Sequence, residues 1–394
     1  MKALPPVRRP VPLVARRVRK PLAAAFGGWG VRICGSGTQA LAMALTDARM
    51  HLSAEAPEVI LPAYGCPDLV TASVYAGLRP RLVDTAPSGQ WGYDLGALKK
   101  VLAGEGRSGQ RGADNCAAIV AVNLLGTGDQ AVELAQIATE TGIALIQDSA
   151  QHLPRHLPAQ WLGDYVVLSF GRGKPLNLLG GGALLHHPDR SDDIASQGVR
   201  PMKGPMESPL LGRLAGLAFN LATRPRAYGL ARRLMGSSVG GTRYKALEAV
   251  HEGSAGKIAV VESGLAGYEV TPGYDASMWS VACAAWAPDG VEMLSCASST
   301  VPDKLRLRLA MLAPDGKSRD AIVTALEQKG LGASAMYGAT MEKLEAVPAE
   351  VASQGPFPNA ADLARRLFTL PTHSCVGPAA LRETQAIVAG LLGH

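Results

Sequence analysis

The stretch Ser169-Phe-Gly-Arg-Gly-Lys174-Pro-Leu-Asn-Leu-Leu-Gly-Gly-Gly182 places one lysine between apolar residues and a run of glycines. Upstream, the apolar strand pattern of Ile146-Gln-Asp148-Ser-Ala-Gln151 ends on an aspartate. A lysine amine becomes a good nucleophile where apolar or cationic neighbours disfavour its ammonium form, and we expect Arg172 and the flanking apolar residues to do this for Lys174. A surface lysine at a turn is the alternative. The combination of lysine and strand-end aspartate is typical of a pyridoxal phosphate pocket, with Lys174 as the Schiff-base residue.

Short apolar strands alternate with amphipathic helices through much of the chain. The strands are predicted at 31–34, 58–61, 81–84, 117–122, 144–147, 165–169 and 182–186, and the helices at 67–76, 95–102, 130–141 and from Thr38 onward. This alternation predicts an α/β fold, in which helices cover both faces of a mostly parallel sheet. Ligands of such sheets bind at the carboxyl ends of the strands, where Gly35, Tyr64, Asp148 and Ser169 fall.

Three parts follow from the patterning of the 394 residues. Residues 1–30 form a basic N-terminal arm, and 31–265 form a large cofactor-binding domain that includes an irregular region, 190–265, with one long helical stretch near 210–234. Residues 266–394 form a smaller α+β domain. Its predicted elements are a strand at 303–312 with one exposed face, a helix at 318–329, a strand at 333–336 and helices at 359–368 and 378–392.

The basic charge is concentrated at the N-terminus. The formal net charge is +6, yet the first twenty residues contain seven Lys or Arg and no Asp or Glu, so the remainder is near neutral. This argues against a nucleic-acid partner. We interpret the arm as flexible or laid over a partner subunit. Contact with anionic lipid or a substrate phosphate is the alternative.

Targeting and metal signals are absent from the sequence. The arm lacks the continuous apolar segment of a secretory signal, and no apolar run reaches the length of a transmembrane helix. The six cysteines form no C-x-x-C pair, which argues against a zinc site or a disulfide framework and fits a reducing compartment. His152 and His156 are separated by Pro154 and lack a third ligand. We therefore expect a cytoplasmic protein without a bound metal.

The segment Gly35-Ser-Gly37-Thr38 follows a strand and opens a helix, so its N–H groups can hold a phosphate. It also matches the G-x-G-x-x-A pattern of nicotinamide and flavin oxidoreductases. That alternative expects an acidic residue at the end of the next strand, whereas Glu58 precedes its strand and Asp84 comes much later. It also leaves Lys174 and its aspartate without a role.

Four further side chains have predicted cofactor contacts. Asp148 would keep the pyridine nitrogen protonated, although a strand-end aspartate often caps the next helix. Gln151 would bind the phenolic oxygen, and Ser169 the phosphate. Tyr64 would stack on the ring, with a buried core tyrosine as the alternative. Cys66 lies near the proposed site, but no histidine base is close in sequence.

Four motifs occur in the order found in one known family. They are Ser36-Gly-Thr-Gln-Ala-Leu41, Glu58-Val-Ile-Leu-Pro-Ala-Tyr64, the pair Asp148 and Gln151, and Ser169 with Lys174 before the glycines. On these motifs the sequence resembles the DegT/DnrJ/EryC1/StrS family of sugar aminotransferases, which are fold type I pyridoxal phosphate enzymes with a large and a small domain.

The resemblance implies transfer of an amino group from a donor such as glutamate to a keto group. The acceptor would be a nucleotide-linked keto-sugar of polysaccharide or secondary-metabolite biosynthesis. It implies phosphate contacts from Gly37, Thr38 and Ser169, and catalytic roles for Lys174 and Asp148. It also implies a homodimer whose sites share residues across the interface.

Two departures from the family pattern leave an alternative open. The glycine cluster lacks the glutamate of G-E-G-G, and no clear G-x-N-x-R segment is present, the nearest being Val239-Gly-Gly-Thr-Arg-Tyr244. A non-catalytic or regulatory member that binds the cofactor is therefore the second hypothesis. A related dehydratase is disfavoured, because it carries histidine where this chain has Lys174.

Overall fold

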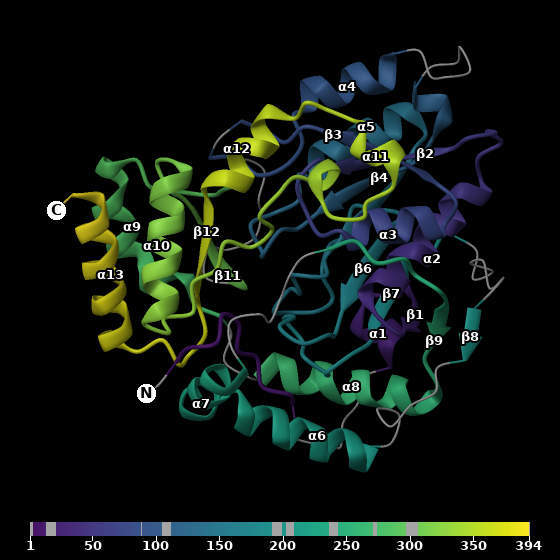
Figure 1. Ribbon diagram of the computed structural model, residues 1–394. Helices are drawn as coiled ribbons and strands as arrows, with labels where there is room; N and C mark the ends of the chain where they lie inside the picture. The colour runs from purple at the N-terminus through teal and green to yellow at the C-terminus, as the bar shows by residue number, and fades with distance from the viewer. Residues whose placement is uncertain are drawn as a thin grey trace.

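A computed structural model describes residues 3–12, 21–87, 89–104, 112–190, 199–201, 209–235, 243–270, 274–296 and 306–393 (Figure 1). Within these ranges the main sheet has nine strands in the order β3-β2-β4-β5-β6-β7-β1-β9-β8. Their bounds are Gly30–Cys34, Glu58–Pro62, Arg79–Val83, Cys116–Val122, Ala144–Asp148, Tyr165–Ser169, Gly182–His186, Val199–Pro201 and Val250–Glu252 for β1 to β9. Strands β2 to β6 are parallel, whereas β7 is antiparallel to β6 and β1. The predicted α/β class and mostly parallel sheet are confirmed.

Helices cover both faces of this sheet. Along β4, Ala118 and Val120 pack into a core with α2 and α3, while Ile119 and Ala121 pack on the other face against α4 and α5. This alternation explains why the strand is apolar throughout, since both faces of a parallel sheet are buried. The helices are α1 (Leu22–Ala25), α2 (Gly37–Met50), α3 (Asp68–Tyr75), α4 (Leu95–Ala103), α5 (Ala131–Thr141) and α8 (Ala255–Val270).

A second, antiparallel sheet contains β10 (Glu292–Met293), β11 (Arg308–Leu312) and β12 (Leu367–Pro371). It packs with helices α9, α10 and α13, which stand beside one another in Figure 1. Their bounds are Ser280–Trp286 for α9, Gly316–Gln328 for α10 and Pro378–Leu392 for α13. The helices α11 (Ala349–Ala352) and α12 (Pro358–Arg366) bury their apolar residues in the core of the large sheet.

The sequence predictions for this part need three corrections. The helix expected at 359–368 ends at Arg366, because the apolar residues that follow form the buried strand β12. The strand expected at 333–336 is a single bridge between Ser334 and Thr369. Strand β11 has no exposed face, since Arg308 is buried and donates to the carbonyls of Gly332 at 2.9 Å and Thr369 at 3.1 Å. Residues 303–305 of that predicted strand lie outside the described residues.

Residues 3–12 of the basic arm are part of the folded body. The Ala3 N–H donates to Pro225 O at 2.9 Å, and Val11 exchanges two hydrogen bonds with the Asn220 side chain at 2.8 and 3.0 Å. The Arg9 guanidinium lies 4.8 Å from the Tyr268 ring centroid. The expectation of a flexible arm is therefore wrong for these residues.

The long helical stretch expected near 210–234 is two helices, α6 (Pro209–Ala222) and α7 (Pro225–Met235). Pro225 has no N–H to continue the first helix, but it is well suited to open the second. Among the helices of the described ranges, none combines the length and apolar character needed to span a bilayer.

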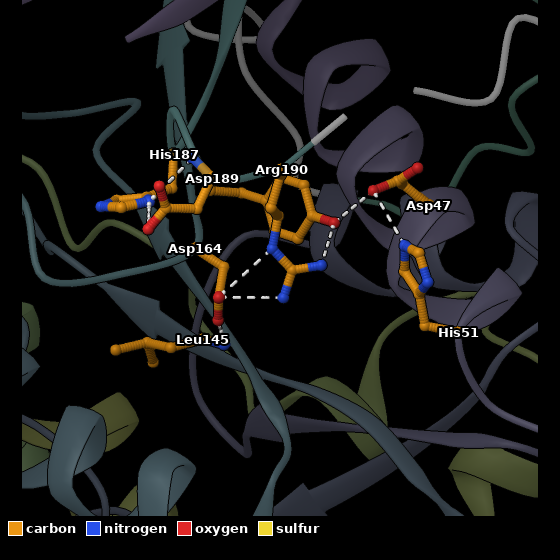
Figure 2. A network of polar contacts seen from close by, with 8 residues as sticks. Asp47, His51, Leu145, Asp164, His187, Asp189 and Arg190 are labelled. Atoms are coloured by element: carbon orange, nitrogen blue, oxygen red, sulfur yellow. Dashed lines mark hydrogen bonds and ion pairs between the residues drawn. The ribbon is translucent and has the colours of Figure 1, made fainter. Parts of the chain in front are cut away.

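A polar network ties α2 to the start of β6 (Figure 2). The Tyr165 hydroxyl donates to Asp47 of α2 and accepts a hydrogen bond from Arg190 Nη1 at 2.8 Å. Arg190 also pairs with Asp164 at 2.9 Å. Since α2 begins at Gly37 and β6 ends at Ser169, this network fixes the far ends of the two elements that meet at the candidate site.

Replacing Tyr165→Phe should lower the free energy of unfolding by about 1–3 kcal/mol, because buried Asp47 loses its donor. Urea unfolding followed by circular dichroism measures the change. Tyr75→Phe is the control, since the Tyr75 hydroxyl makes no hydrogen bond with the described residues. Equal stability of the two variants would show that the network contributes nothing.

Candidate active site

One cavity opens at the carboxyl ends of β4, β5 and β6, at the start of α2. It encloses about 720 Å³ including its open mouth, which suits a small-molecule ligand. Six of the seven predicted cofactor residues line it: Gly37, Thr38, Asp148, Gln151, Ser169 and Lys174. Its other lining residues are Ser36, Leu41, Cys66, Asp68, Leu69, Val122, Asn123, Leu124, Ala150 and Tyr337.

The start of α2 forms one wall of the cavity at very close range. A Cβ atom on Gly37 would lie 2.8 Å from the Cβ of Ser169, and one on Gly182 would lie 2.5 Å from the backbone of Ser36. Only glycine permits these approaches. The helix begins with an N-cap at Ser36, whose side chain accepts a hydrogen bond from Gln39 N at 3.2 Å. Free N–H groups and the positive end of the helix dipole therefore face the cavity beside the Ser169 hydroxyl, as a phosphate site requires.

Asp68 was not anticipated at this wall. The Thr38 hydroxyl donates to Asp68 Oδ2 at 2.8 Å, and both residues line the cavity. A bound phosphate would have to compete with this carboxylate for the threonine hydroxyl. The sequence signal was Asp68 at the start of α3, a position that usually indicates only a favourable helix-dipole contact.

Asp148 and Lys174 border the cavity from β5 and from the loop after β6. Burial raises the pKa of Asp148, against the opposing effects of a hydrogen bond from Ala150 N and of the Lys174 charge. The Lys174 amine makes no hydrogen bond or ion pair with the residues that the structure describes. The amine is therefore available to a ligand, and a cation placed at Asp148 would relieve its buried charge.

The expectation that Arg172 acts as a cationic neighbour of Lys174 is wrong. Arg172 is exposed. The side-chain charges that act on the Asp148 carboxyl are those of Lys174, which lowers its pKa, and Asp68, which raises it. Lys174 lines the cavity and Arg172 does not, and Gly173 separates the two residues in a left-handed conformation. Gly173 has a φ of 73°.

Gln151 is held on both sides of its amide. Its Oε1 accepts from Leu125 N at 2.9 Å, and its Nε2 donates to the Tyr337 hydroxyl at 3.0 Å. An amide nitrogen carries two hydrogens, so one donor remains for a ligand. Tyr337 comes from the chain segment after α10, so the small sheet's part of the protein contributes to the cavity.

Tyr64 does not line the cavity. It is fully buried, with its ring centroid 5.7 Å from that of Tyr337 in an edge-on arrangement. The alternative of a core tyrosine fits this position.

Cys66 lines the cavity in the loop that follows β2. Burial raises the pKa of the Cys66 thiol to about 12, so it remains protonated at neutral pH. The expectation from the sequence that Cys66 lies near the site agrees with this position.

A buried lysine supports the glycine cluster from behind. Lys257 of α8 is 1% exposed, and its Nζ donates to Gly180 O at 2.9 Å. A Cβ on Gly181, which has a φ of 99°, would lie 2.8 Å from Lys257 Cε. The sequence offered no signal for this contact, because the helix containing Lys257 lies in the region with weak periodicity.

The sequence model of the DegT/DnrJ/EryC1/StrS aminotransferase family matches residues 21–223, more than half of the chain. The chain belongs to this family. Enzymes of the DegT family are pyridoxal phosphate-dependent aminotransferases, which accords with a lysine, an aspartate and a helix N-terminus around one cavity. A comparison with curated proteins finds no significant match.

Solved structures of DegT-family proteins share the fold. A DegT DnrJ EryC1 StrS aminotransferase from Brucella abortus is 18% identical, with 95% of this chain and 88% of that chain covered and a TM-score of 0.64. NtdA from Bacillus subtilis, solved with the cofactor PMP, is 13% identical over 95% and 75%, with a TM-score of 0.64. DesI, solved in the presence of its TDP-sugar product, is 21% identical over 98% and 86%, with a TM-score of 0.60.

The dinucleotide-binding alternative does not fit the sheet. The G-x-G-x-x-A pattern binds dinucleotides where its strand belongs to a parallel βαβ unit. Here β1 is antiparallel to both of its neighbours, β7 and β9. The glycine-rich turn is therefore an anion site of a different architecture.

Replacing Gly37→Ala should lower the free energy of unfolding by about 1–3 kcal/mol, because the new methyl group forces α2 away from Ser169. Affinity for pyridoxal phosphate should fall with it. Gly180→Ala is the matched control, since a Cβ there would have nothing within 4 Å. Urea unfolding and absorbance titration measure both effects, and a Gly37→Ala protein as stable as the control contradicts the close-approach argument.

Replacing Asp148→Asn should stabilise the cofactor-free protein at neutral pH. The pKa of Asp148 is raised in the folded state, so its ionisation opposes folding. The wild type should therefore lose stability relative to the variant as pH rises above about 4, the ordinary aspartate value. Unfolding midpoints measured across this range should diverge, and parallel pH profiles would contradict the assignment.

Proposed function

We propose that this DegT-family protein transfers an amino group from an amino-acid donor, glutamate, to the keto group of a nucleotide-linked sugar. The observation that carries the proposal is the placement of Lys174 and Asp148 around one cavity that also contains the N-terminus of α2. The sugar acceptor rests on the family and on DesI, a fold neighbour solved with a TDP-sugar product. A place in polysaccharide or secondary-metabolite biosynthesis follows from that acceptor class.

The residues present fit pyridoxal phosphate. The N–H groups at Gly37 and Thr38 and the Ser169 hydroxyl would bind the phosphate, and Asp148 would pair with the protonated ring nitrogen. The remaining N–H of Gln151 would bind the phenolic oxygen. When bound, the cofactor supplies an aldehyde for the amino group and a ring that withdraws electrons from the reacting carbon.

Lys174 has two tasks in this proposal. Its amine would hold the cofactor covalently between turnovers, and once released it would carry a proton to and from the substrate carbon. Such general acid–base assistance is typically worth ~10²–10⁴ in rate. Cys66 would stay a neutral thiol on the cavity wall, because burial keeps its pKa high.

The assembly belongs to the same proposal. We propose a homodimer with shared sites, a cofactor domain spanning 31–265 and a small domain spanning 266–394. Support for the two domains comes from the separate nine-stranded and three-stranded sheets of the described residues. Light scattering of the purified protein measures the oligomeric state.

Replacing Lys174→Ala should abolish covalent attachment of the cofactor and lower kcat by at least ~10²-fold. Borohydride reduction followed by peptide mass spectrometry locates the attached group. Arg172→Ala is the control, since this neighbouring cation is exposed and should leave attachment intact. Attachment to a different lysine, or full activity of the Lys174 variant, would overturn the assignment.

Substrate class is tested by converting the pyridoxamine phosphate form back to the pyridoxal phosphate form. Nucleotide-linked keto-sugars should bring about this conversion, whereas simple 2-keto acids other than that of the donor should not. Cofactor binding without turnover of any keto compound would instead support the regulatory alternative.

A further inference from the structure

The outer face of α6 is apolar. Leu214, Leu217 and Leu221 are 55%, 47% and 53% exposed, and Ala218 and Ala222 beside them are exposed too. Spacings of three and four residues place all five on one side of the helix. A helix that covers a globular core turns its large apolar side chains inward, so this stripe is the reverse of the usual arrangement.

The inner face of α6 already has its own contacts. Gly216 is buried, Ala215 and Phe219 are half-buried, and Asn220 exchanges hydrogen bonds with Val11. Gly216, Phe219 and Asn220 thus face the protein, while Leu214, Leu217 and Leu221 point away from it. The exposed stripe follows from this fixed orientation of the helix.

The surroundings of the stripe are basic. Residues 208–247 contain no Asp or Glu and seven Lys or Arg: Arg213, Arg224, Arg226, Arg232, Arg233, Arg243 and Lys245. Among them Arg213, Arg224 and Arg226 are exposed. The segment therefore joins an apolar face to positive charge, and its own sequence contains no carboxylate.

The N-terminal arm adds to this charge. Arg8 Nε donates to Thr223 O at 3.0 Å, and Ala3 N to Pro225 O at 2.9 Å, so the described part of the arm is attached at the corner between α6 and α7. The first twenty residues carry seven Lys or Arg and no acidic residue. Among the described residues of this arm, Arg8 therefore lies beside the acid-free segment 208–247.

The position and length of α6 suit a surface contact. In Figure 1, α6 lies along the lower edge of the molecule beneath α8, and α7 lies to the left of both. The 14 residues of α6 extend about 21 Å, less than the ~30 Å of a bilayer's hydrocarbon core. The helix could therefore lie in the plane of a membrane surface but could not cross it.

We propose that α6 and the α6–α7 corner dock the protein on an anionic lipid surface. Leu214, Leu217 and Leu221 enter the headgroup region, and Arg213, Arg224 and Arg226 pair with lipid phosphates. A second copy of this chain fits less well. A symmetric contact would set these arginines against one another, and the segment offers no carboxylate to separate them.

The test is flotation of the full-length holoprotein with lipid vesicles. Wild type should float with phosphatidylglycerol-containing vesicles at least tenfold more than with pure phosphatidylcholine, and high salt should abolish the difference. L217D/L221D should lose at least tenfold of this binding. R224S/R226S should lose the part of vesicle binding that high salt abolishes in the wild type. V132D is the matched control, since Val132 is a 54% exposed apolar residue on α5.

Cofactor absorbance checks that each variant is folded, and L214S/L217S provides a milder second pair if L217D/L221D does not bind cofactor. Three results would overturn the proposal. They are no flotation of wild type with anionic vesicles, equal losses in V132D and the leucine variants, and a change in light-scattering mass of L217D/L221D without lipid binding by wild type. The last result would identify the stripe as a contact between copies.

Discussion

The site depends on one steric constraint, the contact between the start of α2 and the ends of β6 and β7. Gly37 and Gly182 have no room for a Cβ there, because Ser169 and the backbone of Ser36 occupy that space. The contact brings the N–H groups of a helix terminus beside a serine hydroxyl. It also places the loop that carries Lys174 at the edge of the same cavity. The glycine run is therefore needed for packing, and Lys257 supports it from the opposite side.

Charge in the cavity is arranged for a ligand and not for stability. Asp148 is buried with a raised pKa, and its direct partner among the described residues is a backbone N–H. The Thr38 hydroxyl donates its hydrogen bond to the Asp68 carboxylate. An anion at the helix terminus together with a cation at Asp148 would satisfy both ends of the cavity. A phosphate ester attached to a protonated pyridine has this combination, which is why the family assignment and the electrostatics agree.

The two departures from the family motifs have different weights. The glycine cluster lacks a glutamate, yet its backbone geometry is supported by Lys257 and by the close approach to Ser36. The nearest candidate for a G-x-N-x-R segment, Val239 to Tyr244, lies mostly outside the described residues and follows α7 in the chain. The family model itself extends to residue 223 and so includes α6.

Local patterning in the sequence determined most of the strands and helices of the large sheet and six of the residues that line the cavity. Strands β1 to β7, helices α3 to α5 and the start of α2 were predicted within two residues, since periodicity and glycine punctuation act over short distances. Six residues that line the cavity (Gly37, Thr38, Asp148, Gln151, Ser169 and Lys174) were predicted from motifs at strand ends. Only tertiary structure decided that Tyr64 lies in the hydrophobic core and that Cys66 lines the cavity. It also decided that Arg308 and Lys257 are buried and that residues 367–371 form a strand. Each of these depends on which distant segment packs against the residue, and a short stretch of sequence does not contain that partner.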